Sequence, residues 1–236
     1  MYTIEYILKQ LANDIQTEKL RTLYKADYIK SMPKNYRKEY SDAIIKDLNK
    51  YNIEKLFKDI KKITRSEPYN MKHEKLSLEK ILSIPFQRSK EKLTAKSLKG
   101  CIFKSTIGEI IDYETPIKDP GGKNNKGVGK VDLLAYNDND KYLSLIEFKY
   151  KNNQEPLLRA ILEICTYYYQ IDRDRLKIDF GKENIGEIHK VVLVYKGSEQ
   201  HKDYLNSETD FKTLIQKLDV EIYLFDDINK EVIEIP

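Results

Sequence analysis

The chain has 236 residues, of which 34% are charged and 40% are hydrophobic, and its formal net charge is +4. This length allows one large domain or a domain with an appendage, and the 18 Tyr and 7 Phe exclude a disordered chain. No apolar run approaches the ~18 residues of a membrane span, and no basic segment followed by an apolar stretch opens the chain. We therefore expect a cytoplasmic protein without membrane contacts.

Histidine and cysteine residues are too few and too scattered for several kinds of site. His73, His189 and His201 do not form the pattern of a zinc cluster or of a Ser/His/Asp triad. Cys101 and Cys165 have no pair-like spacing, so we expect two buried free thiols rather than a disulfide or a zinc site.

Positive charge is concentrated in the first part of the chain. Residues 1–90 hold 20 Lys and Arg against 12 Asp and Glu, whereas residues 91–236 hold 22 against 26. A basic surface favours contact with the phosphates of a nucleic acid, and a lysine-rich surface is also simply well solvated. Charge alone leaves both interpretations open.

Residues 1–85 are predicted to be a basic, all-helical N-terminal region. Apolar residues recur at helical spacing in four segments, at residues 3–15, 17–29, 40–48 and 53–63. The breaks at Glu67-Pro-Tyr-Asn70 and Ile84-Pro85 place the end of this region near residue 85, which leaves residues 86–236 as a second domain.

From residue 89 onward the pattern alternates between helix and strand. It predicts a helix over residues 89–100 and a strand over residues 109–118. The basic connector 119–130 is not a P-loop, because Val131 follows Gly129-Lys130 where Ser or Thr is needed. Two alternatives stay open for it: a mobile connector, or a loop that follows a nucleic-acid backbone with its lysines Lys123, Lys126 and Lys130.

Residues 131–150 are predicted to form a β-hairpin that carries charged groups where a core is expected. Two apolar runs, 131–136 and 142–150, flank the turn-forming segment Asn137-Asp-Asn-Asp140. The apolar character of the second run favours a central strand over an exposed hairpin with a Glu/Lys pair. Because side chains alternate along a strand, Glu147 and Lys149 share one face.

The length of the hairpin loop decides on which face Asp132 lies. With a four-residue loop at 137–140, Asp132 lies opposite Leu145 and is a diagonal neighbour of Glu147, at roughly 7–8 Å between Cα atoms. A five-residue loop would turn Asp132 to the other face of the sheet. The shorter loop therefore predicts that Asp132, Glu147 and Lys149 converge.

Two carboxylates and one lysine on a buried strand would be unfavourable without a partner, because unpaired buried charge is costly. A divalent cation offsets that cost, and Mg²⁺ commonly takes one or two carboxylates together with waters and substrate phosphate. We therefore expect Mg²⁺ or Mn²⁺ as the cofactor, bound by Asp132, Glu147 and the main-chain carbonyl of Phe148. Lys149 would orient or deprotonate the attacking water, or stabilise charge at phosphorus.

Asp132 followed by Glu147-Phe148-Lys149 resembles the D…(D/E)xK signature of the PD-(D/E)xK nucleases, the restriction-endonuclease-like superfamily. The resemblance covers roughly the last two-thirds of the chain, with Val131 where the name-giving proline would be. It implies a metal-dependent nuclease that hydrolyses phosphodiester bonds, with DNA favoured over RNA as the substrate. Asp132, Glu147 and Lys149 would be its catalytic residues.

The resemblance also implies further acidic and basic site residues. Nucleases of this superfamily carry an acidic residue on the helix before the first strand, which points to Glu91, with Glu114 as the rival candidate. RecB-like members place a Gln-xxx-Tyr motif on the helix after the hairpin, and Glu163-Ile-Cys-Thr-Tyr167 is similar, with Glu in place of Gln. Glu163 would then assist the metal site, and nucleic acid would contact three residues, Lys151, Arg159 and Tyr167. The alternative for Arg159 and Glu163 is an ordinary i,i+4 ion pair.

The remaining pattern completes an α/β fold. A helix follows Pro156, strands are predicted at 189–195 and 220–225, a helix at 210–218, and a short edge at 230–236. The order predicts a mixed sheet of about five strands flanked by helices, a restriction-endonuclease-like core. The rival functions are a catalytically silent nuclease-fold module that binds nucleic acid or a protein partner, and a helical interaction protein. A homodimer stays open.

Overall fold

The computed structural model describes residues 2–17, 19–75, 77, 90–104, 106–120, 128–227, 229 and 231–235. The helices, with 3₁₀ helices written η, are α1 (Ile4–Gln16), η1 (Lys19–Lys25), α2 (Asp27–Lys30), η2 (Lys34–Tyr36), α3 (Arg37–Leu48), α4 (Ile53–Lys58), α6 (Lys90–Leu98), α7 (Leu157–Gln170), α8 (Arg173–Asp179), α9 (Glu199–Leu205) and α10 (Thr209–Leu218). The strands are β1 (Ile102–Phe103), β2 (Gly108–Pro116), β3 (Lys130–Asn137), β4 (Tyr142–Lys149), β5 (Ile188–Tyr195), β6 (Val220–Asp226) and β7 (Glu231–Glu234).

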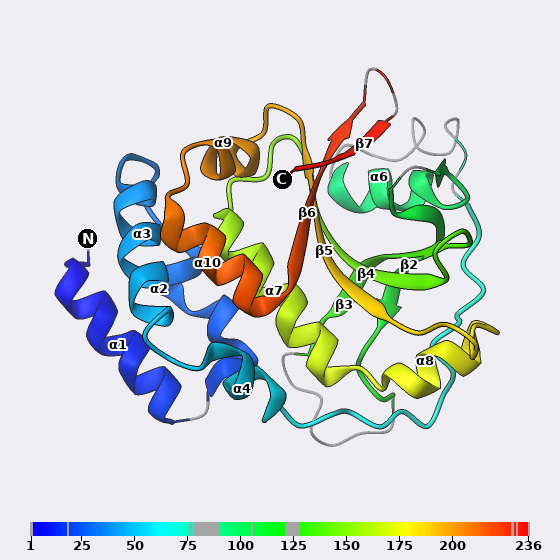
Figure 1. Cartoon of the computed structure of the whole chain (residues 1–236), viewed down its shortest axis with the longest axis horizontal. Coiled ribbons are helices and arrows are strands. Elements are labelled where there is room, and N and C mark those ends of the chain that lie inside the picture. Colours follow the sequence, from blue (N-terminus) through cyan, green and yellow to red (C-terminus); the bar gives the residue numbers. More distant parts are fainter. Residues whose placement is uncertain are drawn as a thin grey trace.

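Within the part of the chain that the structure describes, seven strands form one mixed sheet in the order β1 to β7. Figure 1 labels β2 to β7. Strands β1 to β4 pair antiparallel, β4 to β6 run parallel, and β7 returns antiparallel to β6. The prediction of about five strands flanked by helices was therefore wrong. Strand β1 has only two residues and no periodicity to reveal it, and the expected short edge at the end of the chain pairs with β6 as a further strand, β7.

The sheet curls until it is nearly closed into a barrel. Its edge strands β1 and β7 line a common pocket, and the ring of Phe103 in β1 lies 6.3 Å from that of Phe225 in β6. The inner face buries its own aromatic side chains, among them Phe148 and Tyr195, together with Ala95 of α6. Among the described helices, α6 alone contributes buried residues to this core, through Ala95 and Leu98, so the sheet is not flanked by helices on both faces as predicted.

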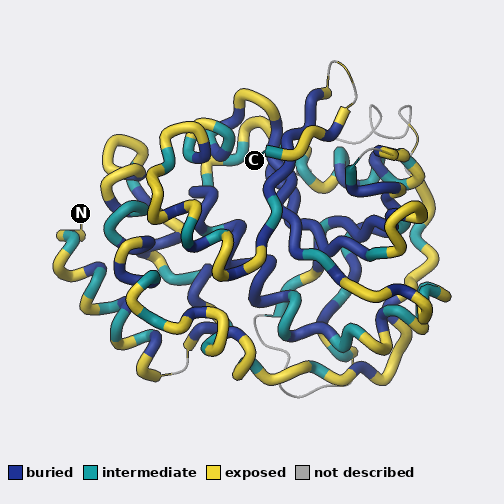
Figure 2. Tube along the Cα trace, in the orientation of Figure 1, coloured by how far each residue is buried: buried dark blue, intermediate teal, exposed yellow. Residues whose placement is uncertain are grey.

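The outer face of the sheet packs on α7. Ile161 of α7, Leu145 of β4 and Leu11 of α1 belong to one apolar core, so the N-terminal helices and the sheet bury their apolar faces together. Ile63 N–H also donates to the Gln170 carbonyl at 2.7 Å. Figure 2 shows α7 and the strands as the buried centre, with exposed turns of the N-terminal helices around one side.

The N-terminal region is helical up to Lys58, but its described residues 59–75 and 77 contain no helix, so the predicted helix over 53–63 is too long and the region is not helical throughout. Helices α1 and α3 match the predicted segments 3–15 and 40–48. The predicted helix over 17–29 is instead divided into η1 and α2 by extended backbone at Ala26, whose φ is −57° and ψ is 135°. The predicted domain boundary near residue 85 lies outside the described residues.

Two expectations from composition can be compared with the structure. Cys101 and Cys165 are both free thiols, but Cys165 alone is buried, because Cys101 lies beside α6 at the rim of the inner core. Among the helices that the structure describes, none has the length and apolar character needed to cross a membrane.

Candidate active site

The register between β3 and β4 brings the predicted site residues together. The ladder runs from Leu133 opposite Ile146 to Asn137 opposite Tyr142, so the loop has four residues, 138–141. The predicted loop length of four residues is confirmed, but the loop is 138–141 rather than 137–140, so each β3 residue pairs two residues further along β4 than predicted. If this register is extended by one residue pair, Asp132 lies opposite Glu147 rather than opposite Leu145.

The shift has a local cause at Asn137. Its side-chain oxygen accepts hydrogen bonds from the N–H groups of Asn139 at 3.0 Å and Asp140 at 3.1 Å. Asn137 thus ends β3 and caps the turn at the same time, as asparagine commonly does. This arrangement moves the loop one residue toward the C-terminus.

Asp132 lies where the β3–β4 ladder ends. Its Oδ2 accepts a hydrogen bond of 3.0 Å from the Phe148 N–H, so the carboxylate takes the place of a main-chain partner. In an antiparallel pair the N–H and C=O of one residue point to the same side. The Phe148 carbonyl therefore points toward β3, the strand that carries Asp132.

Glu147 and Lys149 are both 3% exposed on the face of β4 that packs on α7. The Lys149 ammonium lies 2.7 Å from Glu147 Oε1, 3.1 Å from Glu155 Oε2 and 3.7 Å from Glu163 Oε2. Among the described residues, Glu147 Oε2 and Glu163 Oε2 have no hydrogen-bond partner although both are buried. Lys149 and Arg159 lie 3.7 and 3.6 Å from Glu163 Oε2, so Glu147 Oε2 is the oxygen that most needs a donor or a cation.

Burial governs the charge states of these groups. It raises the pKa of Asp132 to about 7, against the opposing effects of Lys149 and the Phe148 N–H. Burial, and next the charge of Asp132, raise the pKa of Glu147 well above its ordinary value. Burial lowers the pKa of Lys149, but the carboxylates around it, first Glu147, outweigh that effect and the net pKa is raised. These shifts favour the neutral form of the two carboxyl groups and the charged form of Lys149, so a positive charge is more stable in this site than a negative one.

Helix α7 adds the polar row that its sequence predicted. Arg159 forms a short ion pair with Glu155 and lies 3.6 Å from Glu163 Oε2. The Tyr167 hydroxyl donates to Glu163 Oε1 at 2.6 Å. Tyr167 is only 4% exposed, so its predicted contact with nucleic acid does not fit this arrangement, and its hydroxyl instead orients Glu163.

The two candidates for the additional acidic residue have different surroundings. Glu91 on α6 accepts hydrogen bonds from the Tyr150 N–H at 3.0 Å and from Asn153 Nδ2 at 2.9 Å. Tyr150 directly follows Lys149 in the chain, so Glu91 lies next to the candidate site. Its charge also helps to raise the pKa of Asp132, after the larger effect of burial. Glu114 in β2 instead lies beside three lysines, Lys92, Lys96 and Lys130.

The basic residues predicted to contact nucleic acid lie at different depths. Lys130 and Lys151 are exposed at the start of β3 and after β4, whereas Arg159 is largely enclosed by its acidic partners. Lys123 and Lys126 lie outside the described residues.

Sequence reasoning missed two partners of the site. Glu155, which bonds Lys149, stands four residues before Arg159, and this helical spacing was a usable signal. Tyr24 of η1 had no such signal. Its carbonyl accepts a 3.2 Å hydrogen bond from Arg159 Nε, and its ring packs edge-on against Tyr167, with 5.8 Å between centroids.

Gly129 lies against Tyr167, so we expect the stability of the protein to depend strongly on the size of the side chain at position 129. A Cβ built on Gly129 would overlap the Tyr167 hydroxyl. We expect Gly129→Ala to lower the free energy of unfolding by about 1–3 kcal/mol, because an overpacked contact must be relieved by movement. Urea denaturation measures this. Gly186→Ala is the matched control, since a Cβ there meets no described atom within 4 Å, and an equal loss in both variants would contradict the expectation.

Comparison with protein-family models, curated proteins and solved structures found no match for this chain. The fold and the function are therefore inferred from the residues and the structure of this chain alone.

Within the described ranges, no group of three or more His, Cys, Asp or Glu side chains is arranged to hold a metal ion. The groups predicted to bind a metal are two carboxylates and one main-chain carbonyl, and Glu147 Oε1 already accepts a hydrogen bond from Lys149.

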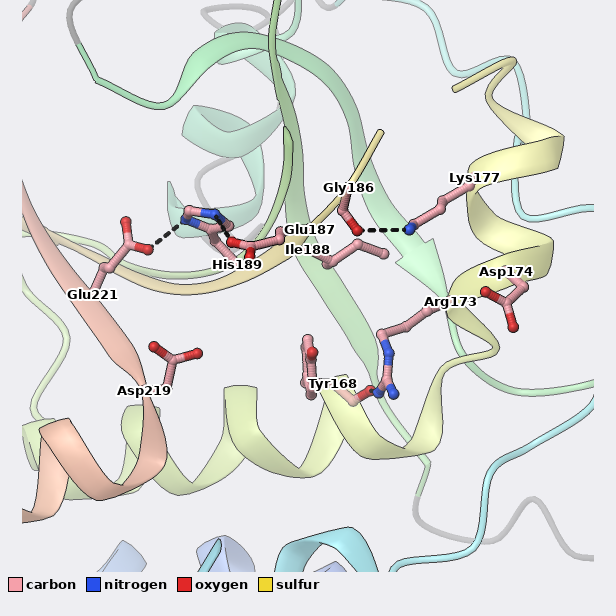
Figure 3. Close-up of a pocket in the computed structure, with 10 residues that line it drawn as sticks. All are labelled: Tyr168, Arg173, Asp174, Lys177, Gly186, Glu187, Ile188, His189, Asp219 and Glu221. Carbon is pink, nitrogen blue, oxygen red and sulfur yellow. Dashed lines mark hydrogen bonds and ion pairs between the residues drawn. The ribbon is translucent and has the colours of Figure 1, made fainter. Parts of the chain in front are cut away.

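A separate pocket of about 420 Å³ lies at the opposite ends of the parallel strands (Figure 3). It opens where β5 and β6 begin, far along these strands from the rungs that carry Glu147 and Lys149. His189 and Glu221 line it, and Figure 3 shows the carboxylate of Glu221 directed at the imidazole. Arg173 and Lys177 in the same pocket already donate to main-chain carbonyls.

The His189–Glu221 pair predicts a pH dependence of stability. Its 2.5 Å contact raises the pKa of His189 above the ordinary 6.5, against the opposing effect of burial. The stabilisation is therefore complete below about pH 6.5 and is lost as the pH rises through the higher value in the folded protein. Glu221→Gln should cost about 1 kcal/mol at pH 6 and little at pH 9 by urea denaturation. Glu183→Gln, at an exposed position, is the control, and an equal loss at both pH values in Glu221→Gln would argue against this account.

Proposed function

We propose that this protein is a cytoplasmic metal-dependent nuclease that hydrolyses phosphodiester bonds of DNA. The observation that carries the proposal is the meeting of Asp132, Glu147 and Lys149 in a buried site where Glu147 Oε2 lacks a hydrogen-bond partner among the described residues. Buried charge of this kind is unfavourable for folding alone, so a role in binding a cation and an anionic substrate is the better explanation.

The donor set fits a hard divalent cation. Asp132, Glu147 and the Phe148 carbonyl offer oxygen atoms, and Mg²⁺ or Mn²⁺ at sites of this type is completed by water and substrate phosphate. Bound there, the ion would supply Lewis-acid stabilisation of phosphate charge and a more acidic water. Lys149 would orient that water and neutralise charge at phosphorus. Glu163 and Glu155 would hold the Lys149 ammonium in position, and Glu91 would hold the segment after β4.

One observation favours the rival function, a catalytically silent module that binds nucleic acid or a protein partner. The Lys149 side chain is only 4% exposed and its ammonium lies beside three carboxylates, which would also suit a purely structural ion network. The two functions differ in whether the bonds of a bound nucleic acid are cut.

The test is a cleavage assay on purified protein with plasmid, linear duplex, single-stranded DNA and RNA. We expect product in Mg²⁺ or Mn²⁺ and none in EDTA. A protein that retards these substrates in a gel but cuts none of them in either metal would support the silent module. Cleavage that persists unchanged in EDTA would rule out the metal-dependent mechanism.

A further inference from the structure

A second charged cluster, formed by Glu114, Lys92, Lys96 and Lys130, borders the candidate active site. The three ammonium groups lie 3.8, 3.4 and 3.9 Å from the Glu114 carboxylate. One carboxylate thus faces three cations, which leaves an excess of positive charge. Lys92 and Lys130 are more than half exposed, so the cluster is open to a ligand from solvent.

The backbone at Glu114 is unusual for a strand residue. Its φ is +49°, a left-handed conformation that side chains other than glycine rarely adopt. In the β2–β3 pairing, Tyr113 lies opposite Leu133 and Thr115 lies opposite Val131. Glu114 therefore lies opposite Asp132. The kink therefore turns an acidic side chain toward α6 at the level of the candidate catalytic aspartate. Conformations of this kind often mark functional segments.

Sequence neighbours connect the cluster to the site. Lys92 follows Glu91 in α6. The Glu91 carboxylate accepts a hydrogen bond from the N–H of Tyr150, which is the residue after Lys149. Lys130 precedes Asp132 by two residues on β3. Lys96 lies 5.5 Å from the centroid of the Tyr113 ring, which restrains its position. The three ammonium groups therefore flank the site along α6 and the start of β3.

We propose that Lys92, Lys96 and Lys130 bind a backbone phosphate of the DNA strand that enters the candidate active site. Glu114 holds the three lysines together in the free protein, and the phosphate replaces its carboxylate on binding. A phosphate matches this geometry because it presents several anionic oxygens to several cations. The choice of DNA rests on the proposed function, but binding is measurable without cleavage.

The test is fluorescence anisotropy with a fluorescein-labelled 20-base-pair duplex and the matching single strand, in EDTA, from 50 to 200 mM KCl. We expect Lys96→Ala and Lys130→Ala each to weaken binding by about threefold to tenfold and to lower the slope of log K against log salt by about one. Glu114→Gln should strengthen binding by a similar factor. Lys55→Ala on α4 and Glu109→Gln on β2 are controls at exposed positions, and circular dichroism checks that every variant is folded.

The outcomes separate this proposal from the proposed function. Lysine variants with unchanged affinity and salt slope, or no binding of either probe, would overturn it. A Glu114→Gln protein that binds no more tightly but has lost metal-dependent cleavage would overturn it too, and would make Glu114 the additional acidic residue. Tighter binding by Glu114→Gln, with no cleavage by the unmodified protein in any metal, would support the phosphate site and reject the nuclease.

Discussion

Asp132→Asn should reduce metal-dependent DNA cleavage by about 10²- to 10³-fold while it stabilises the folded protein at pH 8. In the proposed function, the first effect follows from the loss of a charged ligand of the metal. The second follows from burial, which raises the pKa of Asp132 to about 7. The favourable contribution of the neutral carboxyl is complete below about pH 4 and is lost as the pH rises through about 7.

At pH 8 and without metal, the charged Asp132 therefore opposes folding, and Asn removes that charge. We expect a gain of about 2 kcal/mol, less than the whole pKa shift implies, because Asn also loses its attraction to Lys149. Urea denaturation in EDTA at pH 5 and pH 8 measures the gain, which should be smaller at pH 5. Asp140→Asn, exposed in the same hairpin, is the control. Destabilisation at pH 8, or cleavage at the unmodified rate, would contradict the assignment of Asp132.

Lys149→Met should destabilise the protein by about 3–5 kcal/mol, because it removes the cation from a buried network and leaves its carboxylates uncompensated. Glu147, Glu155 and Glu163 all face the Lys149 ammonium within 3.7 Å. The measurement is urea denaturation at pH 8. Lys141→Met, on the exposed hairpin turn, should change stability by less than about 0.5 kcal/mol.

The double variant Glu147→Gln with Lys149→Met gives this prediction a second check. It removes one charge of each sign, so it should recover a large part of the lost stability, as coupled neighbours do. If the two single effects simply add, Glu147 is not the main partner of Lys149. Since a Lys149 variant loses stability, its loss of cleavage is hard to interpret alone, and Asp132→Asn is the cleaner probe of catalysis.

The N-terminal region contributes to the site as well as to the surface charge of the chain. Tyr24 binds Arg159 through its carbonyl and packs on Tyr167, which orients Glu163. This region and α7 share one apolar core. Point variants in η1 are therefore more informative than a deletion of residues 1–85, which would expose the buried face of α7.

Short-range pattern in the chain was enough to identify the hairpin and the face that carries its charges. Alternation places Glu147 and Lys149 on one side whatever surrounds them, and an even-numbered loop places Asp132 there too. Charged residues within an apolar strand marked the site before any partner was known. Helix α7 and its row of Arg159, Glu163 and Tyr167 were likewise visible, because helical periodicity repeats within a few residues.

Packing between distant segments decided the rest. The two-residue shift of the β3–β4 pairing depends on the Asn137 side chain in the turn, and the near closure of the sheet depends on strands β1 and β7. The partners Glu155 and Tyr24, and the separation of Glu91 from Glu114, follow from how α6 and α7 lie on the sheet and how η1 packs on α7. Periodicity reports which side of an element is buried, but only three-dimensional packing determines which residues from distant parts of the chain meet there.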